Sequence, residues 1–75
     1  MSRRTAERYA LTDAFLDSYI RWREACEDVW SAYRSWAECK PQQRGLGFAA
    51  YQSALDREEH AASLHCQWAE RVAAR

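Results

Sequence analysis

The stretch LDREEHAASLHCQW, residues 55–68, gathers most of the side chains of this chain that could do chemistry. It holds both histidines, one of the three cysteines and three of the eleven acidic residues. Such a collection is typical of a metal site or an acid–base pair, and either requires the side chains to converge on one point. Convergence depends on the element that carries them, and the spacing of the apolar residues predicts a helix.

On a helix these side chains point in different directions. Glu58 and His65 share one face, but two helical turns, roughly 10.5 Å of rise, separate them. One metal ion cannot be reached by both from a single helix, and the Glu-x-x-His spacing of di-iron bundles is absent. We therefore expect no metal and no cofactor within one chain. Instead we expect both residues to be buried polar groups. Glu58 should bond a Tyr hydroxyl, a Trp N–H or an Arg, with Arg23 as the natural partner, and His65 should bond Tyr19 or a partner chain.

An alternative is a metal or cofactor held between two chains, with Glu58 and His65 contributed by both copies. Nucleophilic catalysis is not expected, because no thiol has a base within hydrogen-bond reach in the predicted geometry. The three cysteines show no C-x-x-C spacing, which favours free thiols in a reducing compartment. These patterns predict a protein that is not an enzyme.

Length and composition limit the architecture. Seventy-five residues allow one domain, residues 1–75, with a core too small to be stable without unusually good packing or a partner chain. A hydrophobic content of 48% excludes a disordered chain. Fourteen alanines, two glycines and one proline favour helices throughout. The fold class expected is therefore all-α.

Charge argues against two kinds of partner. Eleven basic and eleven acidic residues give no net charge, which argues against nucleic-acid binding, since phosphates require a basic excess. No apolar run is long enough for a signal peptide or a membrane-spanning helix, so we expect a cytoplasmic protein without a membrane partner. Ten of the eleven bases are arginine, and with the alanine excess this suggests a GC-rich bacterial or phage genome.

One interruption divides the chain into two helices. Pro41 cannot continue a helix that comes before it, and it is well placed to begin one. We predict a helix over about 5–38, a turn over about 39–46 and a helix over about 46–73. Thr12 and Asp13 could cap a later start of the first helix. The short connection makes the helices antiparallel neighbours, an αα-hairpin.

Heptad spacing predicts where the two helices pack. Positions whose numbers sum to roughly 84 should face each other if the turn centres near residue 42. The expected pairs are Trp36–Phe48, Tyr33–Tyr51, Val29–Leu55, Cys26–Glu58, Tyr19–His65 and Phe15–Ala69. The predicted core seam comprises Phe15, Tyr19, Trp22, Cys26, Val29, Tyr33, Trp36, Phe48, Tyr51 and Leu55.

The apolar arc of each helix is wider than one partner helix can cover. We therefore expect the hairpin to dimerise into a four-helix bundle and to act as a non-enzymatic interaction or assembly module through self-association. Another possibility is a small inhibitor or adaptor that docks on a larger protein. The interface residues predicted outside the intrachain seam are Trp30, Leu64, Trp68, Ala54 and Ala61.

Overall fold

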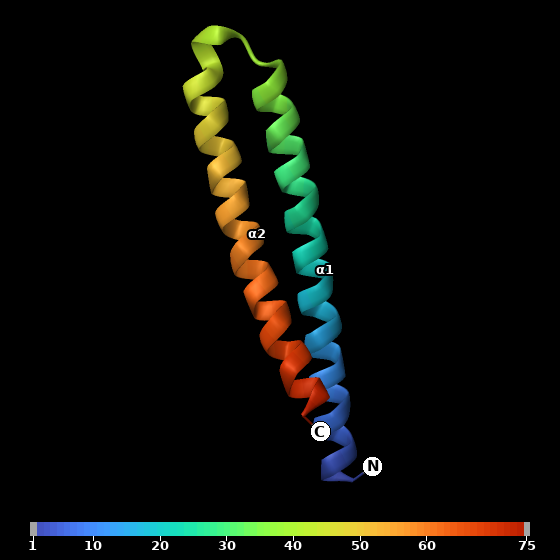
Figure 1. Ribbon diagram of the computed structural model, residues 1–75. Coiled ribbons are helices and arrows are strands. Elements are labelled where there is room, and N and C mark those ends of the chain that lie inside the picture. The colour runs from blue at the N-terminus through green and yellow to red at the C-terminus, as the bar shows by residue number, and fades with distance from the viewer. Residues whose placement is uncertain (1, 75) are drawn as a thin grey trace.

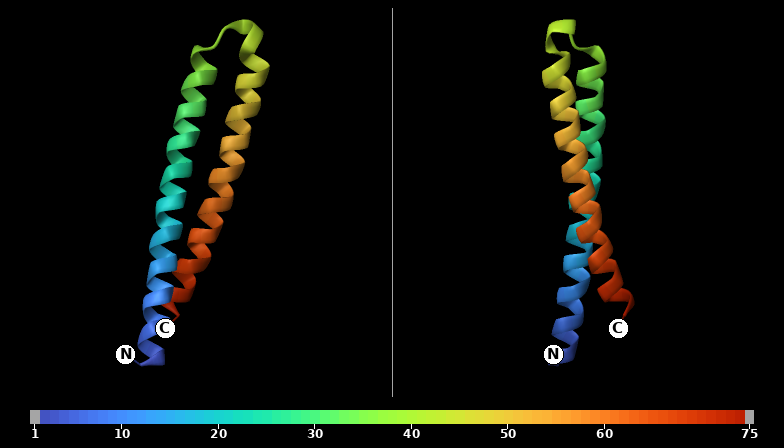
Figure 2. Two further views of the ribbon diagram at one scale, coloured as in Figure 1. Left: turned by 180° about the vertical axis from the view of Figure 1, so that it is seen from behind. Right: turned by 60° about the vertical axis from the view of Figure 1, so that its left-hand side comes forward.

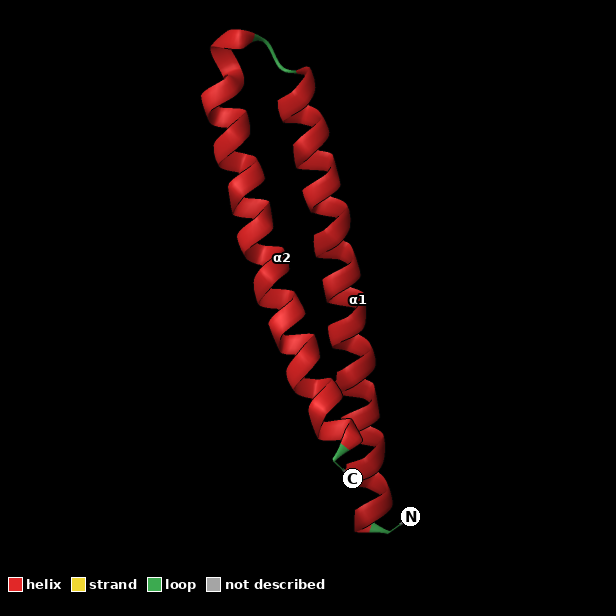
Figure 3. Ribbon diagram, viewed as in Figure 1, coloured by secondary structure: helices red, strands yellow, loops and turns green. Residues whose placement is uncertain are grey.

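The computed structural model describes residues 2–74 and arranges them as an antiparallel helical hairpin (Figure 1). Helix α1 spans Arg3–Glu38, the short 3₁₀-helix η1 spans Pro41–Gln43, and helix α2 spans Arg44–Ala73. Within the described range the structure contains helices and short connections and no strand (Figure 3). The all-α hairpin predicted from the sequence is confirmed.

The first helix starts two residues earlier than about residue 5, where the sequence placed it. Ser2 caps it, because its hydroxyl oxygen accepts a hydrogen bond from the Thr5 backbone N–H at 3.2 Å. Thr12, the alternative start, lies inside the helix, and its hydroxyl donates to the Arg8 carbonyl oxygen at 3.0 Å. A threonine that bonds back to the preceding turn is compatible with a continuous helix.

The turn is shorter than expected. Cys39 and Lys40 are extended, and Pro41 opens η1, where its fixed φ suits a first helical position. The second helix then begins at Arg44 instead of about residue 46. A Cβ atom built on Gly47 would lie 3.2 Å from Trp36 Cδ1 and 3.3 Å from Trp36 Cα. The absence of a side chain at Gly47 therefore lets the helices meet closely beside the turn.

The line of closest approach between the helices runs through small side chains. Ala54 and Ser18 retain only 1% and 6% of their accessible surface, and they are the only residues of the described range in the buried class. Small residues allow backbones to approach, and larger rings then pack beside the contact line. Six predicted seam residues are half-buried along this line: Phe15, Trp22, Cys26, Val29, Trp36 and Tyr51.

The other four predicted seam residues are not buried in the seam, contrary to the prediction. Their side chains lie at the edge of the seam and are exposed, because the small residues beside them occupy its centre: Tyr19, Tyr33, Phe48 and Leu55. Ala54, predicted as an interface residue between chains, is instead the most buried residue of the hairpin. The centre of the seam thus lies between the predicted stripe and the small residues beside it, a rotation of less than one helical position.

The predicted register is nevertheless present. Four expected pairs are in contact: Trp36–Phe48 with ring centroids 5.1 Å apart, Tyr33–Tyr51 at 5.8 Å, Tyr19–His65 at 5.6 Å, and Cys26 Sγ 3.9 Å from Glu58 Oε1. All four sums equal 84. Such a small rotation changes which side chains are central without changing which residues of the two helices lie opposite each other along the rod.

The hairpin is a thin rod with extents of 60 × 17 × 13 Å. The helices lie side by side over most of their length, and a turned view shows them crossing at a shallow angle near the chain ends (Figure 2). Neither helix contains a stretch both long and apolar enough to traverse a lipid bilayer, considering the described residues.

Candidate functional site

Glu58 is held by a tryptophan. Its Oε1 accepts a hydrogen bond from Trp22 Nε1 at 2.8 Å and a weak one from the Cys26 thiol at 3.9 Å. A Trp N–H was one of the partners expected for Glu58, whereas Arg23, the partner favoured from the sequence, is exposed and makes no ion pair within residues 2–74. The indole N–H replaces it because Trp22 occupies the seam itself, whereas Arg23 lies at its edge. An indole N–H commonly finds such a partner when the ring is buried.

The Cys26 thiol lies in the same small cluster. Burial raises its pKa above the ordinary value of 9.0, and the nearby Glu58 carboxylate raises it further, against a smaller lowering by Arg23. A raised pKa leaves less thiolate, the form that attacks electrophiles and binds metals. Cys26 is therefore a packing residue and a weak hydrogen-bond donor, and the structure gives it no activating base.

His65 occupies an aromatic cluster at the other end of the seam. Its ring stacks on Phe15 with centroids 5.0 Å apart and on Trp22 at 5.7 Å, and it contacts Tyr19 at 5.6 Å. Its Nδ1 lies 3.0 Å from Ser18 Oγ, and the Ser18 hydroxyl donates to the Phe15 carbonyl oxygen at 2.7 Å. With that hydroxyl proton engaged, His65 Nδ1–H is the donor to Ser18.

This arrangement corrects the expected partner of His65. The contact with Tyr19 is between rings, and the hydrogen bond goes to Ser18. Sequence reasoning missed Ser18, although a signal was present. A small polar residue three positions after Phe15 and four before Trp22 continues the 3-4 spacing of the seam.

Trp22 separates the carboxylate from the imidazole. Its Nε1 bonds Glu58 while its ring plane lies 9° from that of His65. No group of three or more His, Cys, Asp or Glu side chains in the described part of the chain is arranged to hold a metal ion. Glu58 and His65 are therefore each satisfied by protein partners inside one chain. The stretch that looked like one site is two structural clusters joined by an indole ring.

The hairpin presents two unlike faces on either side of the seam. One is a shallow groove of about 740 Å³, which we call the mixed-charge groove. Arg21 pairs with Asp17 at 2.8 Å on its α1 rim, and Arg71 lies over the Trp68 ring at 4.7 Å at its lower end. The groove is lined by Ala14, Asp17, Ser18, Arg21, Ser53, Asp56, Arg57, His60, Ala61, Leu64 and Trp68.

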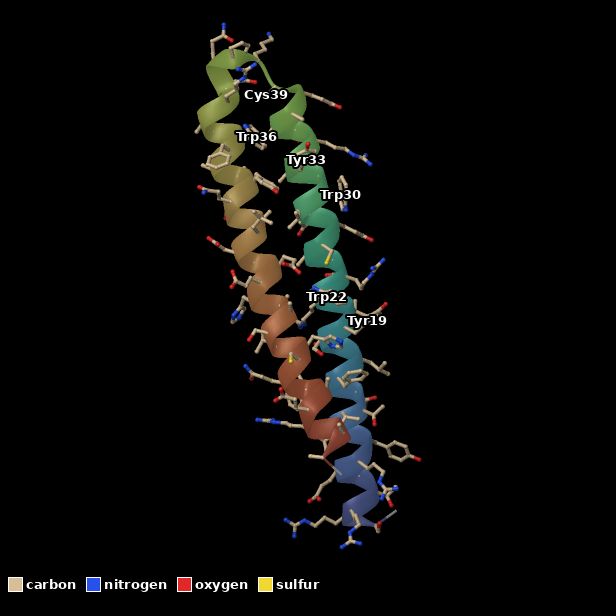
Figure 4. All side chains as sticks on the ribbon, in the orientation of Figure 1. Tyr19, Trp22, Trp30, Tyr33, Trp36 and Cys39 are labelled. Carbon is tan, nitrogen blue, oxygen red and sulfur yellow. The ribbon has the colours of Figure 1, made fainter. Side chains whose placement is uncertain are left out.

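The opposite side, which we call the aromatic face, carries most of the large apolar side chains. Helical spacing puts these positions on the flank of each helix away from the groove. Trp30 is 65% exposed, and Figure 4 shows it on the outer side of α1, whereas Trp36 points between the helices. The aromatic face comprises Leu16, Tyr19, Trp30, Tyr33, Phe48 and Leu55, all exposed, while Tyr9 and Ile20 are exposed on the outer side of α1.

The predicted interface residues therefore do not form one surface. Ala61, Leu64 and Trp68 line the mixed-charge groove, and Ala54 lies between the helices. Trp30 alone belongs to the aromatic face, where it meets Tyr33 edge-on with ring centroids 6.1 Å apart. The sequence pattern found the surplus of apolar side chains but did not separate the two faces.

The three thiols make only local contacts within the described residues. Cys39 donates to the Trp36 carbonyl oxygen at 3.1 Å, and Cys66, exposed on α2, donates to Glu70 at 3.7 Å. These contacts are local to one helix turn, so the packing of the two helices depends on the seam residues and not on the thiols.

Comparison of the chain with protein-family models, curated proteins and solved structures gave no match.

Proposed function

We propose that this hairpin is a non-enzymatic interaction or assembly module that acts by self-association through its aromatic face. The observation that carries the proposal is the size of the apolar surface that the single chain leaves in water. Among residues 2–74, ten large hydrophobic side chains are exposed, and six of them belong to the aromatic face. Contiguous exposed apolar patches larger than a few hundred Å² mark interaction sites in soluble proteins.

The thinness of the hairpin explains why folding alone cannot cover this surface. Two helices form a single layer, so each helix contacts its neighbour along one stripe only. Ala54 is the one hydrophobic residue that is fully buried among those described. A second layer of helices on the aromatic face would bury Trp30 and its neighbours and would give a four-helix bundle.

The polar clusters support a structural role in such a module. Among the described residues, every buried side-chain nitrogen and oxygen has a hydrogen-bond partner. Glu58 and His65 therefore specify the pairing of α1 with α2, through Trp22 and Ser18 respectively. A buried polar pair of this kind fixes register in helical assemblies.

Sedimentation equilibrium over a range of concentrations tests self-association. We expect wild-type dimer, and we expect Trp30→Ala to weaken it at least tenfold, because exposed tryptophans at interface centres are frequent hot spots. Leu16→Ala and Leu64→Ala form a matched pair, since the same deletion is made on the aromatic face and in the groove.

Of this pair, Leu16→Ala should weaken the dimer and Leu64→Ala should leave it unchanged, while circular dichroism should show all variants to be helical. A wild-type chain that is folded and monomeric at every concentration contradicts self-association and points to docking on another protein. Equal weakening by Leu16→Ala and Leu64→Ala would show that the aromatic face is not the specific surface.

A further inference from the structure

We infer that the occupant of the aromatic face is a second copy of the chain in parallel orientation, with α1 of each copy lying along α2 of the other. This inference rests on the proposed self-association and specifies its geometry. Two identical faces can meet about a two-fold axis in two ways. A two-fold axis parallel to the helices pairs α1 of one copy with α2 of the other at the same height along the rod. A two-fold axis perpendicular to the helices pairs α1 of one copy with α1 of the other, and α2 with α2.

Charge distinguishes the two arrangements. Arg23 lies five residues after the buried Ser18 and Glu59 lies five residues after the buried Ala54, so a base of α1 and an acid of α2 occupy matching positions at the edge of the aromatic face. Neither Arg23 nor Glu59 makes an ion pair within the described hairpin. Pairing α2 with α2 would leave each Glu59 without a basic partner. Pairing α1 with α2 brings a basic flank against an acidic one.

The axis along the helices also fixes the register, because symmetry keeps both copies at the same level. Residues at one level have numbers that sum to about 84, as the Trp36–Phe48 contact shows. Arg23 and Glu59 sum to 82, which places each Arg23 beside Glu59 of the second copy. The pair therefore forms twice in the dimer without any sliding of one hairpin along the other.

Side-chain size agrees with the same arrangement. The lower half of α1 presents Leu16 and Tyr19, both exposed, at the levels where α2 presents Ala62, Cys66 and Ala69. Large side chains of α1 then enter the space above small ones of α2 in the other copy, as knobs enter holes.

The size of the rod allows an interface of standard size. Its extents, 60 × 17 Å, give each broad side a projected area of about 1,000 Å², compared with the roughly 800 Å² per partner of a standard specific interface. The mixed-charge groove has similar length but is rimmed by charged pairs such as Asp17–Arg21, which a second copy would have to desolvate. The aromatic face carries no such internal ion pair among the described residues.

Charge exchange tests the inferred contact. Arg23→Glu and Glu59→Arg should each weaken dimerisation about fivefold or more, since each reversal replaces two attractive pairs by two repulsive ones. The double variant should recover wild-type affinity to within about threefold. Failure of the double variant to recover, with helicity intact, overturns the contact.

Labels at the turn test the orientation. Gln42→Cys, made in a chain whose three native cysteines are replaced by alanine, accepts one spin label per hairpin. Parallel copies place the two labels at the same end, about 20–30 Å apart for helices spaced by 8–10 Å. A separation near the 60 Å length of the rod overturns the parallel arrangement but leaves self-association standing. Absence of any dimer in sedimentation contradicts the proposed function itself.

Discussion

The hydrogen bond between Trp22 and Glu58 gives the sharpest test of how the two helices are held. Replacing Trp22 by Phe removes the donor that lies 2.8 Å from Glu58 Oε1 and keeps an aromatic ring to stack on His65. A hydrogen bond to a charged group contributes about 1.5–3 kcal/mol when fully buried. Both side chains are only half-buried, so we expect the lower part of that range.

The smaller ring adds a second loss of about 0.5–1 kcal/mol from the apolar surface no longer buried. Trp22→Phe should therefore lower the free energy of unfolding by about 2 kcal/mol, a large part of the stability of so small a domain. Urea unfolding followed by circular dichroism, at one protein concentration and with reductant, measures this change. Glu58→Gln is the control, because the amide oxygen can still accept from the indole.

A double-mutant cycle separates the hydrogen bond from the ring. Trp22→Phe, Glu58→Ala and the double variant should show a coupling free energy of about 1 kcal/mol. Residues that do not interact add to within roughly 0.3–0.5 kcal/mol. A coupling below that level would show that the contact does not stabilise the hairpin and would refute the role given to Glu58.

Two glycines and two cysteines give further tests. Gly45→Ala should raise the free energy of unfolding by about 0.5 kcal/mol through helix propensity, because nothing lies within 4 Å of the added Cβ. Gly47→Ala, measured by the same urea titration, should lower it by about 1 kcal/mol, because the added Cβ meets the Trp36 backbone; equal effects would contradict the close packing. Cys26 should react with a thiol reagent at pH 8 more slowly than exposed Cys66, because its pKa is raised. The preference of the folded chain for the protonated Cys26 thiol also makes stability fall as pH rises above 9.0, and Cys26→Ala should remove that loss in a pH series of unfolding curves.

The fold could be predicted because its determinants are local in the sequence. Pro41 marks the turn, and the heptad spacing on each side requires helices. Once the turn is placed, antiparallel geometry fixes which levels meet, and pairs such as Trp36–Phe48 and Tyr33–Tyr51 follow. These inferences need only the chain order and the period of a helix.

The details of the seam could not be predicted in the same way. A small rotation of each helix brings Ser18 to the centre of the seam in place of Tyr19, and Ala54 in place of Leu55, and both choices satisfy the heptad spacing. The close approach of the backbones decides between them, and that depends on packing along the whole length of the helices. The partner of Glu58 likewise depends on the rotamer of the Trp22 side chain, which spacing does not specify.

The contacts between the helices form a ladder whose sequence separation grows with distance from the turn. Trp36 and Phe48 are twelve residues apart, whereas Ser18 and His65 are 47 apart. The entropic cost of closing a loop rises only with the logarithm of that separation. Forming the Ser18–His65 contact first would therefore cost about 1.2 kcal/mol more than forming the Trp36–Phe48 contact first. The contacts beside the turn form first, and they remove most of this entropic cost for each contact that forms after them. The hairpin should therefore fold as a zipper from the turn, and amide hydrogen exchange should be slowest near Trp36 and fastest beyond His65.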